Sequence, residues 1–302
     1  MEKELCGVIL VNKHKGVTSH DIVFKIRKLF GTKKVGHTGT LDPLATGVLP
    51  VLVGRAAKAA EFLLSERKCY VAEIQLGITS DTQDITGEIL SKSDTLPTEI
   101  EFFSACNDFT GEIDQLPPMY SALKVNGQKL VDLARQGIEV ERQARRINIY
   151  SIAPEAINPE KGLYRIRVDC SKGTYIRTLC HDIGAKLGCG AVMTELTRVK
   201  SGSFELANAY TIKELEDMEP EKRLSLLQPV EELFDQAPSV SLPDFYARLL
   251  RSGCEIYQRK IGTSIENGTF VRVYDKNGFF ALGQVQEYEN GSAIKAVKLF
   301  VL

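Results

Sequence analysis

The chain lacks the motifs of several large classes of protein. Its seven cysteines are odd in number and contain no Cys-x-x-Cys pair, which disfavours a disulfide framework and a four-cysteine zinc site. The four histidines show no His-x-x-x-His spacing, and neither a phosphate-binding loop nor a Gly-x-Gly-x-x-Gly motif occurs. We therefore predict no metal site, no nucleotide-binding fold, and thiols that are mostly buried and reduced.

Long hydrophobic runs are also missing. The apolar run near the N-terminus is too short for a signal peptide or a membrane span, and Val48–Val53 is short and interrupted by Pro50. We expect a soluble, cytoplasmic protein that has no membrane partner. The 302 residues suffice for one large domain, or for a large and a small one.

Charge is balanced over the chain but not along it. Residues 1–60 carry ten Lys or Arg against four Asp or Glu, whereas residues 211–240 carry three against eight. Three of the four histidines also lie in the basic part. A polyanion bound by the N-terminal part explains this asymmetry, and a solvated basic face without a partner explains it about equally well.

Hydrophobic periodicity predicts the elements of the N-terminal part. We predict strands at Val8–Asn12 and Val48–Val53, and a helix over His20–Phe30 with Thr18 or Ser19 as its N-cap. The glycine-rich stretch 33–47 is predicted to be a structured loop, neither helix nor strand. Residues 56–64 are predicted to be helical.

Two segments alternate as half-buried strands do. In Lys68–Leu76, Tyr70 shares its face with alternate apolar residues, so its ring is expected to be buried. Residues 164–170 follow the same pattern. A helix is then predicted with Thr174 as N-cap, and Arg177 lies beside its apolar stripe, where a buried stem lets the charged head reach a neighbouring pocket.

The rest of the chain divides into an insertion, an acidic segment and a tail. Gln115–Arg146 is largely polar and basic, and it is predicted to be a long insertion able to cover a substrate. Residues 211–240 are helical in pattern. From residue 238 onward we predict a small all-β domain, with strands at Phe270–Tyr274, Gly278–Gln286 and Ile294–Phe300.

Asp42 is the sharpest candidate for chemistry. An Asp before Pro is most often a turn or cap residue. Here, however, it lies between Gly36, Gly39 and Gly47, which allow close approach of backbone or ligand. Nearby His, Thr and Lys side chains add polar groups and positive charge. This combination suits a carboxylate in a pocket that receives a polyanion.

The segment that holds Asp42 resembles a known family. Gly36-His37-Thr38-Gly39-Thr40-Leu41-Asp42-Pro43-Leu44-Ala45-Thr46-Gly47 is similar to the catalytic motif of the TruB family of tRNA pseudouridine synthases. Four further segments agree in order and spacing: residues 68–77, 118–124, 134–138 and 170–177. The resemblance covers about residues 5–235, and the tail resembles the family's small PUA-like domain only weakly.

The resemblance implies roles for individual residues. Asp42 falls on the family's catalytic aspartate, Tyr70 on the tyrosine that stacks on the flipped base and is implicated in proton transfer, and Arg177 on the arginine that pairs with the aspartate. His37 falls on the histidine that helps to hold the target nucleotide out of its stem-loop. The remaining candidate substrate contacts are Tyr175, Lys13, Lys15, Lys33 and Lys34.

The resemblance also implies a fold and an activity. The expected fold is α+β, with a pseudouridine synthase domain at residues 1–237 built on a large, mostly antiparallel sheet with flanking helices. A PUA-like domain is expected at 238–302. The expected activity is isomerisation of uridine 55 in the T stem-loop of tRNA, by base flipping and an aspartate nucleophile, without cofactor or metal. The expected protein is a monomer that requires no protein partner.

Three alternatives remain. The first is a tRNA-folding chaperone on the same scaffold, but a pure binder has no need of Asp42, Tyr70 and Arg177 together. The second is a relative that uses guide RNA and partner proteins; the insertion favours a stand-alone enzyme, because it can serve as an RNA clamp. The third is a carboxylate glycosidase, which needs a second carboxylate across the scissile bond, and the sequence indicates none near the motif.

Overall fold

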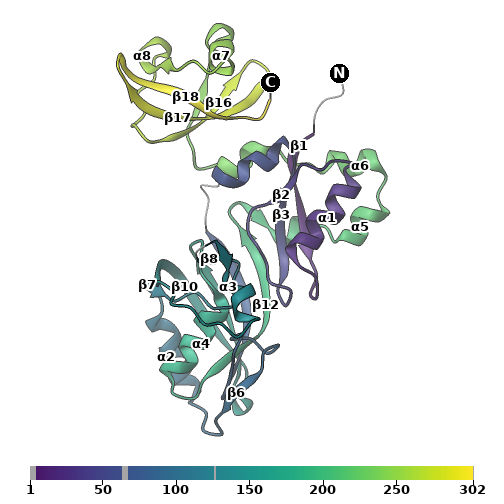
Figure 1. Cartoon of the computed structure of the whole chain (residues 1–302), viewed down its shortest axis with the longest axis vertical. Helices are drawn as coiled ribbons and strands as arrows, with labels where there is room; N and C mark the ends of the chain where they lie inside the picture. Colours follow the sequence, from purple (N-terminus) through teal and green to yellow (C-terminus); the bar gives the residue numbers. More distant parts are fainter. Residues whose placement is uncertain (1–4, 63–66, 126, 302) are drawn as a thin grey trace.

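A nine-stranded sheet runs through most of the computed structural model, which describes residues 5–62, 67–125 and 127–301 (Figure 1). Its strands are β1 (Cys6–Lys13), β2 (Val35–His37), β3 (Thr46–Gly54), β4 (Lys68–Leu76), β7 (Gly111–Gln115), β10 (Arg145–Asn158), β11 (Leu163–Cys170), β12 (Ala191–Ser201) and β13 (Phe204–Glu205). The main order is β1-β3-β12-β4-β11-β10-β7, with β2 on β3 and β13 on β12. Every pair is antiparallel except β3 with β12, which confirms a mostly antiparallel sheet.

The apolar patterns of the sequence account for these strands. On β4, Tyr70 is buried together with the alternate residues that follow it, and β11 buries Tyr164 to Cys170 in the same way, as predicted. The uninterrupted apolar run of β1 has a different cause, because Ile9 and Val11 enter one core while Val8 and Leu10 enter another. A strand that is buried on both faces is apolar along its whole length and shows no alternation of polar and apolar residues.

Helices cover the sheet at both ends (Figure 1). α1 (Ser19–Leu29) packs on β2 and β3, and Thr18 is its N-cap in a capping box with Asp21. α4 (Ile176–Lys186) packs on β4 and β12 and contacts α2 (Glu99–Asp108). The acidic segment forms short helices, as its pattern predicted. α5 (Ile212–Asp217) and α6 (Pro220–Ser225) lie near α1, whereas the 3-10 turn η4 (Val230–Phe234) packs on β1 and η1 (Arg55–Phe62).

Three local predictions need correction. Residues 35–37 are not loop but strand β2, since they pair with residues 51–53 of β3, and β3 itself begins at Thr46. The N-cap of α4 is Tyr175 rather than Thr174, whose hydroxyl donates to the Ser171 carbonyl. The helix at 56–64 is the 3-10 element η1 (Arg55–Phe62), and residues 63 and 64 lie outside the described residues.

Two connections extend from the sheet beside the cavity described below. Between β7 and β10, the predicted insertion forms a small hairpin and a short helix: β8 (Lys124–Val125), β9 (Gln128–Lys129) and α3 (Leu130–Ala134). Its ends, Gln115 and Arg145, pair within the sheet, so both anchors are fixed. A second hairpin joins β5 (Ile78–Ser80) to β6 (Ile89–Lys92). The remaining 3-10 turns are η2 (Pro159–Lys161) and η3 (Leu206–Asn208).

The C-terminal part builds a separate five-stranded sheet in the order β14-β16-β17-β18-β15 (Figure 1). Its strands are β14 (Ser239–Ser241), β15 (Ile256–Tyr257), β16 (Phe270–Asp275), β17 (Gly278–Tyr288) and β18 (Gly291–Leu299). The part is β-rich, but the prediction that it is all β is wrong, because it also contains α7 (Asp244–Arg251) and α8 (Gln258–Ile261). α7 alternates apolar and polar residues at helical spacing and buries Ala247 and Leu250 in the local core.

The structure bears on two predictions, that of buried thiols and that of no membrane-spanning segment. All seven cysteines are free thiols, and five of them are buried, as predicted: Cys69, Cys106, Cys170, Cys180 and Cys189. Within the described residues, no helix is both long enough and apolar enough to cross a bilayer.

Candidate active site

Asp42 lies in the loop of residues 38–45 that joins β2 to β3, and neighbouring elements hold this loop from several sides. The Ser19 hydroxyl donates to the Leu41 carbonyl at 3.0 Å and accepts from the Leu41 amide at 2.8 Å. The Gly16 amide donates to the Pro43 carbonyl at 2.8 Å. The Lys13 ammonium, which is fully buried, donates to the Ala45 carbonyl at 2.5 Å. The loop has no regular structure of its own, yet its backbone is fixed.

Gly47 brings β3 close to β12 just after the loop. Its φ is +108°, and a Cβ there would lie 2.2 Å from the Arg198 carbonyl oxygen. In the only parallel pairing of the described sheet, Gly47 lies opposite Arg198. A glycine is therefore required for both its backbone conformation and its lack of a side chain.

Asp42 forms an ion pair with Arg177, as the resemblance implied. The Arg177 guanidinium lies 2.8 Å from the Asp42 carboxylate; the arginine side chain is 6% exposed and the aspartate side chain 39%. Arg177 also donates to the carbonyls of Thr82, at 3.0 Å, and Tyr120, at 2.9 Å. The guanidinium is thus fixed by main-chain contacts, while the carboxylate remains open on one side.

A second carboxylate lies on the other side of Arg177. Asp84 is 3.7 Å from the guanidinium and its side chain is 8% exposed. It accepts hydrogen bonds from Thr82 and Thr86. Asp84 therefore stabilises the turn before β6 and lies behind Arg177 as seen from Asp42.

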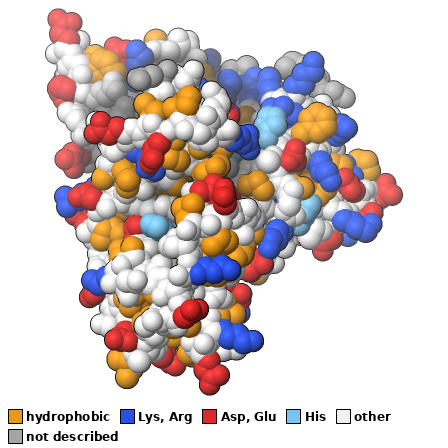
Figure 2. Space-filling model, turned by 60° about the horizontal axis from the view of Figure 1, so that its bottom comes forward, with side chains coloured by type: hydrophobic (Ala, Val, Ile, Leu, Met, Phe, Trp, Pro, Cys, Tyr) orange, Lys and Arg blue, Asp and Glu red, His pale blue; other side chains and the backbone are white. Residues whose placement is uncertain are grey.

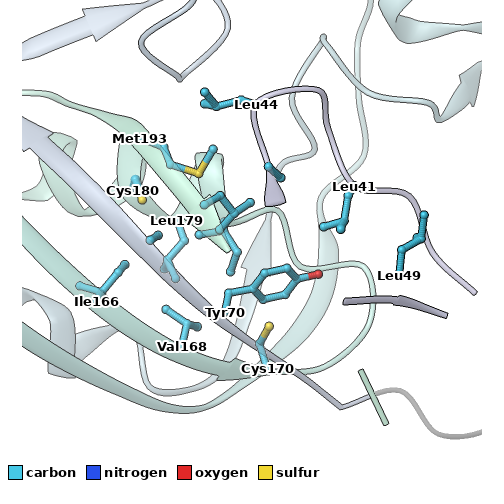
Figure 3. Close-up of a cluster of buried hydrophobic side chains, with 14 of the residues drawn as sticks. Leu41, Leu44, Leu49, Tyr70, Ile166, Val168, Cys170, Leu179, Cys180 and Met193 are labelled. Atoms are coloured by element: carbon cyan, nitrogen blue, oxygen red, sulfur yellow. The ribbon is translucent and has the colours of Figure 1, made fainter. Parts of the chain in front are cut away.

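Tyr70 lies at the centre of the sheet and reaches the same site (Figure 3). It is paired with Val168 on β11 and with Arg198 on β12. The view in Figure 3 shows the ring between the β11 side chains and the loop of Leu41, with its hydroxyl pointing toward the loop. Burial raises the pKa of the hydroxyl above its usual value, so Tyr70 is neutral at neutral pH.

These groups surround a cavity of about 300 Å³, a volume within the range of small-ligand pockets. The cavity gathers residues from β4, the loop, the insertion and the start of α4, including Asp42, Lys68, Tyr70, Leu123, Tyr175 and Arg177. Elements far apart in sequence meet here because β4 and β12 are central strands. A carboxylate, a neutral phenol and two basic side chains line one pocket.

Of the other two predicted non-lysine residues, Tyr175 is among those that line this cavity and His37 is not. The Gln115 side chain bonds both the Tyr175 amide, at 2.8 Å, and the Tyr175 carbonyl, at 3.1 Å. His37 is half-buried at the end of β2, and its Nδ1 accepts from the Gly39 amide at 3.2 Å. Burial lowers the pKa of His37, which makes the imidazole neutral at neutral pH.

The four lysines differ in position. Lys13 is buried beneath the loop, where its amino group bonds main-chain carbonyls. Lys15 forms an ion pair with Glu195 at 2.6 Å. Lys33 and Lys34 are exposed in the turn between α1 and β2. In Figure 2, Lys and Arg side chains are denser on the upper right of the face shown, while others are spread over the rest of it. Direct substrate contacts by these lysines stay predictions.

Sequence reasoning missed two residues of the site. Arg198 is 1% exposed and reaches the Asp42 loop, although a charged residue in a strand usually points to solvent. Gln115, 2% exposed, positions Tyr175. Neither lies in a motif that carries chemistry by itself, so no local signal was available.

Comparison with known proteins identifies the family. The family model described as "TruB family pseudouridylate synthase (N terminal domain)" matches residues 27–176, and "tRNA pseudouridylate synthase B C-terminal domain" matches residues 177–235. The chain belongs to the TruB family. The tRNA pseudouridine synthase B of Clostridium tetani is 43% identical, over 98% of this chain and 99% of the relative. That of Clostridium acetobutylicum is also 43% identical, over 97% and 99%.

Solved structures with the same fold are more distant. This TruB chain matches the structure titled "Crystal Structure of a Cbf5-Nop10-Gar1 Complex" with a TM-score of 0.74 and 29% identity, over 98% of this chain and 85% of that one. "Structure of H/ACA RNP bound to a substrate RNA containing 2'-deoxyuridine" gives 0.73 and 27%, with the same coverage. The α+β fold is therefore the pseudouridine synthase fold, and this TruB protein is an isomerase that acts on uridine in tRNA.

Proposed function

We propose that this enzyme isomerises uridine 55 in the T stem-loop of tRNA, with Asp42 as the nucleophile. The observation that carries the proposal is the ion pair of Asp42 with Arg177 at the wall of a nucleotide-sized cavity. A nucleophilic carboxylate must be ionised, and an adjacent guanidinium favours that form. The reaction breaks the N1–C1′ bond and joins C5 to C1′ of the same nucleotide, so no atoms are gained or lost.

The substrate base must first leave the stacked loop. Flipping costs a few kcal/mol, which contacts in the pocket must offset. Tyr70 and Tyr175 offer aromatic surface for this purpose, and Tyr70 also offers a hydroxyl for proton transfer. His37 is proposed to fill the space left by the base. Attack at C1′ and attack at C6 are both compatible with this arrangement.

We further propose that the enzyme acts alone, as a cytoplasmic monomer. The structural neighbours named above include complexes with protein partners or RNA, at 27–29% identity, whereas relatives named tRNA pseudouridine synthase B match at 43% along their whole length. The insertion between β7 and β10 lies over the cavity through Ser121 to Leu123 and is proposed to clamp the RNA. Its start is tied to Arg177 through the Tyr120 carbonyl.

The test is release of tritium from a tRNA transcript labelled at C5 of its uridines, with the purified protein alone. Wild type should release tritium, while Asp42→Asn should release none and still bind tRNA, because the change is isosteric and removes only the charge. A transcript with cytidine at position 55 should release none with either protein.

The other outcomes discriminate the alternatives. Near-wild-type release by Asp42→Asn would exclude the nucleophile role, and release from the cytidine-55 transcript would exclude the proposed position. No release by wild type with binding intact would favour the tRNA chaperone, or an enzyme that needs a guide or partner.

A further inference from the structure

Arg198 is a buried cation in an unusual situation. Its side chain is 1% exposed and is among the largest fully buried side chains of the protein. Across the part of the chain that the structure describes, no Asp or Glu forms an ion pair with it. Buried charges are otherwise almost always paired, since removal from water is expensive. A residue of this kind calls for a specific reason.

The guanidinium bonds two main-chain carbonyls, one within the Asp42 loop and one in β3 just after it. Nε donates to the Val48 carbonyl at 2.9 Å, and Nη2 donates to the Gly39 carbonyl at 3.2 Å. Gly39 comes before Asp42 and Val48 comes after it, so one side chain spans both ends of the loop. Lys13 supports the same loop from the Ala45 carbonyl. The catalytic carboxylate is thus carried by a segment braced by two buried cations.

The same guanidinium meets Tyr70. Arg198 and Tyr70 are directly paired across β12 and β4, so their side chains lie next to each other on one face of the sheet, with the guanidinium charge near the Tyr70 hydroxyl. A positive charge at this oxygen also favours the phenolate whenever the proton leaves.

We propose that Arg198 is a positioning residue of the isomerisation, which braces the Asp42 loop and keeps a positive charge beside the Tyr70 hydroxyl. The inference rests on the proposed roles of Asp42 and Tyr70. It gives a reason for a buried charge without a carboxylate: a counter-ion at this place would compete for the donors that the Val48 and Gly39 carbonyls use.

Arg198→Met and Arg198→Lys test the role, with Arg223→Met as the matched control. Arg223 is another buried arginine, 8% exposed, and it too bonds main-chain carbonyls, those of Leu29, Leu215 and Met218. It does not line the cavity. We would measure kcat, KM and the pH dependence of kcat by tritium release, together with tRNA binding and thermal unfolding.

The expected pattern separates positioning from structure. Arg198→Met should lower kcat by about 100-fold, the size of effect that a small misplacement of reacting groups produces, with KM changed by less than about threefold. The alkaline limb of its kcat–pH profile should move to higher pH, because the pKa of Tyr70 rises when the neighbouring positive charge is removed. Arg198→Lys, which keeps the charge and part of the donor set, should recover part of kcat. Arg223→Met should unfold at lower temperature with unchanged kcat and pH profile.

Several results would overturn the proposal. These are a kcat within about twofold of wild type in a folded Arg198 variant, a raised KM with unchanged kcat, or the same reduction of kcat in Arg223→Met. Failure of both Arg198 variants to fold, with Arg223→Met folded, would assign Arg198 a purely structural role. Wild-type turnover in Asp42→Asn and Tyr70→Phe would instead overturn the proposed function. If those two variants lose turnover while both Arg198 variants keep it, only the present proposal fails.

Discussion

The cationic side chains of the site are held in place by hydrogen bonds to main-chain carbonyls. Arg177 binds Asp42 on one side and main-chain carbonyls of residues 82 and 120 on the other, so the charge of its head is fixed rather than mobile. Lys13 is held in the same way beneath the loop. Both are long cations whose stems are buried among apolar neighbours and whose heads bond carbonyls that would otherwise lack donors.

The buried position of Lys13 predicts a pH effect on stability. Burial lowers the pKa of its ammonium from 10.5 to about 8 in the folded protein. Between these two values the unfolded chain holds a proton that the native chain does not, so the contribution of Lys13 to stability rises with pH in this window. Relative to Lys13→Met, wild type should therefore gain free energy of unfolding from pH 8 to pH 10.

Urea unfolding of both proteins at several pH values measures this difference. Burial raises the thiol pKa values of Cys106 and Cys170 to about 12, so in this window they ionise only in the unfolded chain; this effect is common to both proteins and cancels. Lys222→Met, which changes an exposed lysine of α6, should show no such trend. A constant difference between wild type and Lys13→Met from pH 7 to pH 10 would contradict the prediction.

At the scale of elements, the site depends on how β3, β4 and β12 lie against one another. β12 carries Arg198 between Tyr70 of β4 and Gly47 of β3, so a shift of any of the three strands displaces the loop or the phenol. α4 adds Arg177 from its first turn, and the turn before β6 adds its carbonyls. The site is thus a junction of elements and belongs to no single one.

Gly47→Ala should break this junction. The positive φ alone costs about 1–2 kcal/mol for a residue with a Cβ. The Cβ would also lie 2.2 Å from the Arg198 carbonyl oxygen, which only a shift of the strand can relieve. Gly188→Ala is the control, because Gly188 has φ +75° with nothing within 4 Å of its Cβ position. Urea unfolding should show a clearly larger loss of free energy for Gly47→Ala, together with reduced kcat. Equal losses in the two variants would refute the role of the close approach.

At the scale of the whole molecule, the C-terminal sheet is joined to the main body by an apolar core. Phe300 and Leu282 from the C-terminal part pack in one cluster with Val8, Val48 and η4 residues of the main body. Phe300 is 1% exposed, and its ring stacks on Phe279 with 5.5 Å between centroids. The alternate residues of β1 that do not face α1 are therefore covered by this joint.

Phe300→Ala should loosen the joint. Replacing a buried Phe by Ala typically lowers the free energy of unfolding by about 3–5 kcal/mol, and we expect a loss of this order. Calorimetry should then resolve separate unfolding transitions for the main body and the C-terminal part. Val301→Ala is the control, because Val301 is 48% exposed. A single unchanged transition for Phe300→Ala would show that the two parts are not coupled through this cluster.

The basic N-terminal part predicts a salt effect on tRNA binding. Replacing Lys33 and Lys34 by Ala should weaken binding and reduce the slope of log K against log salt by about 0.7–0.9 for each phosphate that the variant no longer neutralises. The control is the double replacement of Lys213 and Lys222, exposed lysines of the acidic segment. An unchanged slope for the Lys33 and Lys34 variant would identify these lysines as a solvated face.

The sequence by itself determined the elements and the identity of the chemical groups. Alternation placed Tyr70 on a buried face, capping residues placed the start of α1, and the motif around Asp42 indicated the family, because each of these signals is local in the chain. It failed for strand β2, which is fixed by pairing with β3, and the local patterns of the α4 N-cap and of the helices in the C-terminal part were misinterpreted.

Only the tertiary structure decided which groups meet. Arg198 enters the site because β12 lies between β3 and β4, and Asp84 because the hairpin before β6 folds back on α4. No local pattern records such neighbours, since the free energy that brings them together comes from burial of the apolar faces of the whole sheet. The chemistry was therefore readable in the sequence, whereas the bracing of that chemistry by buried cations depended on long-range packing.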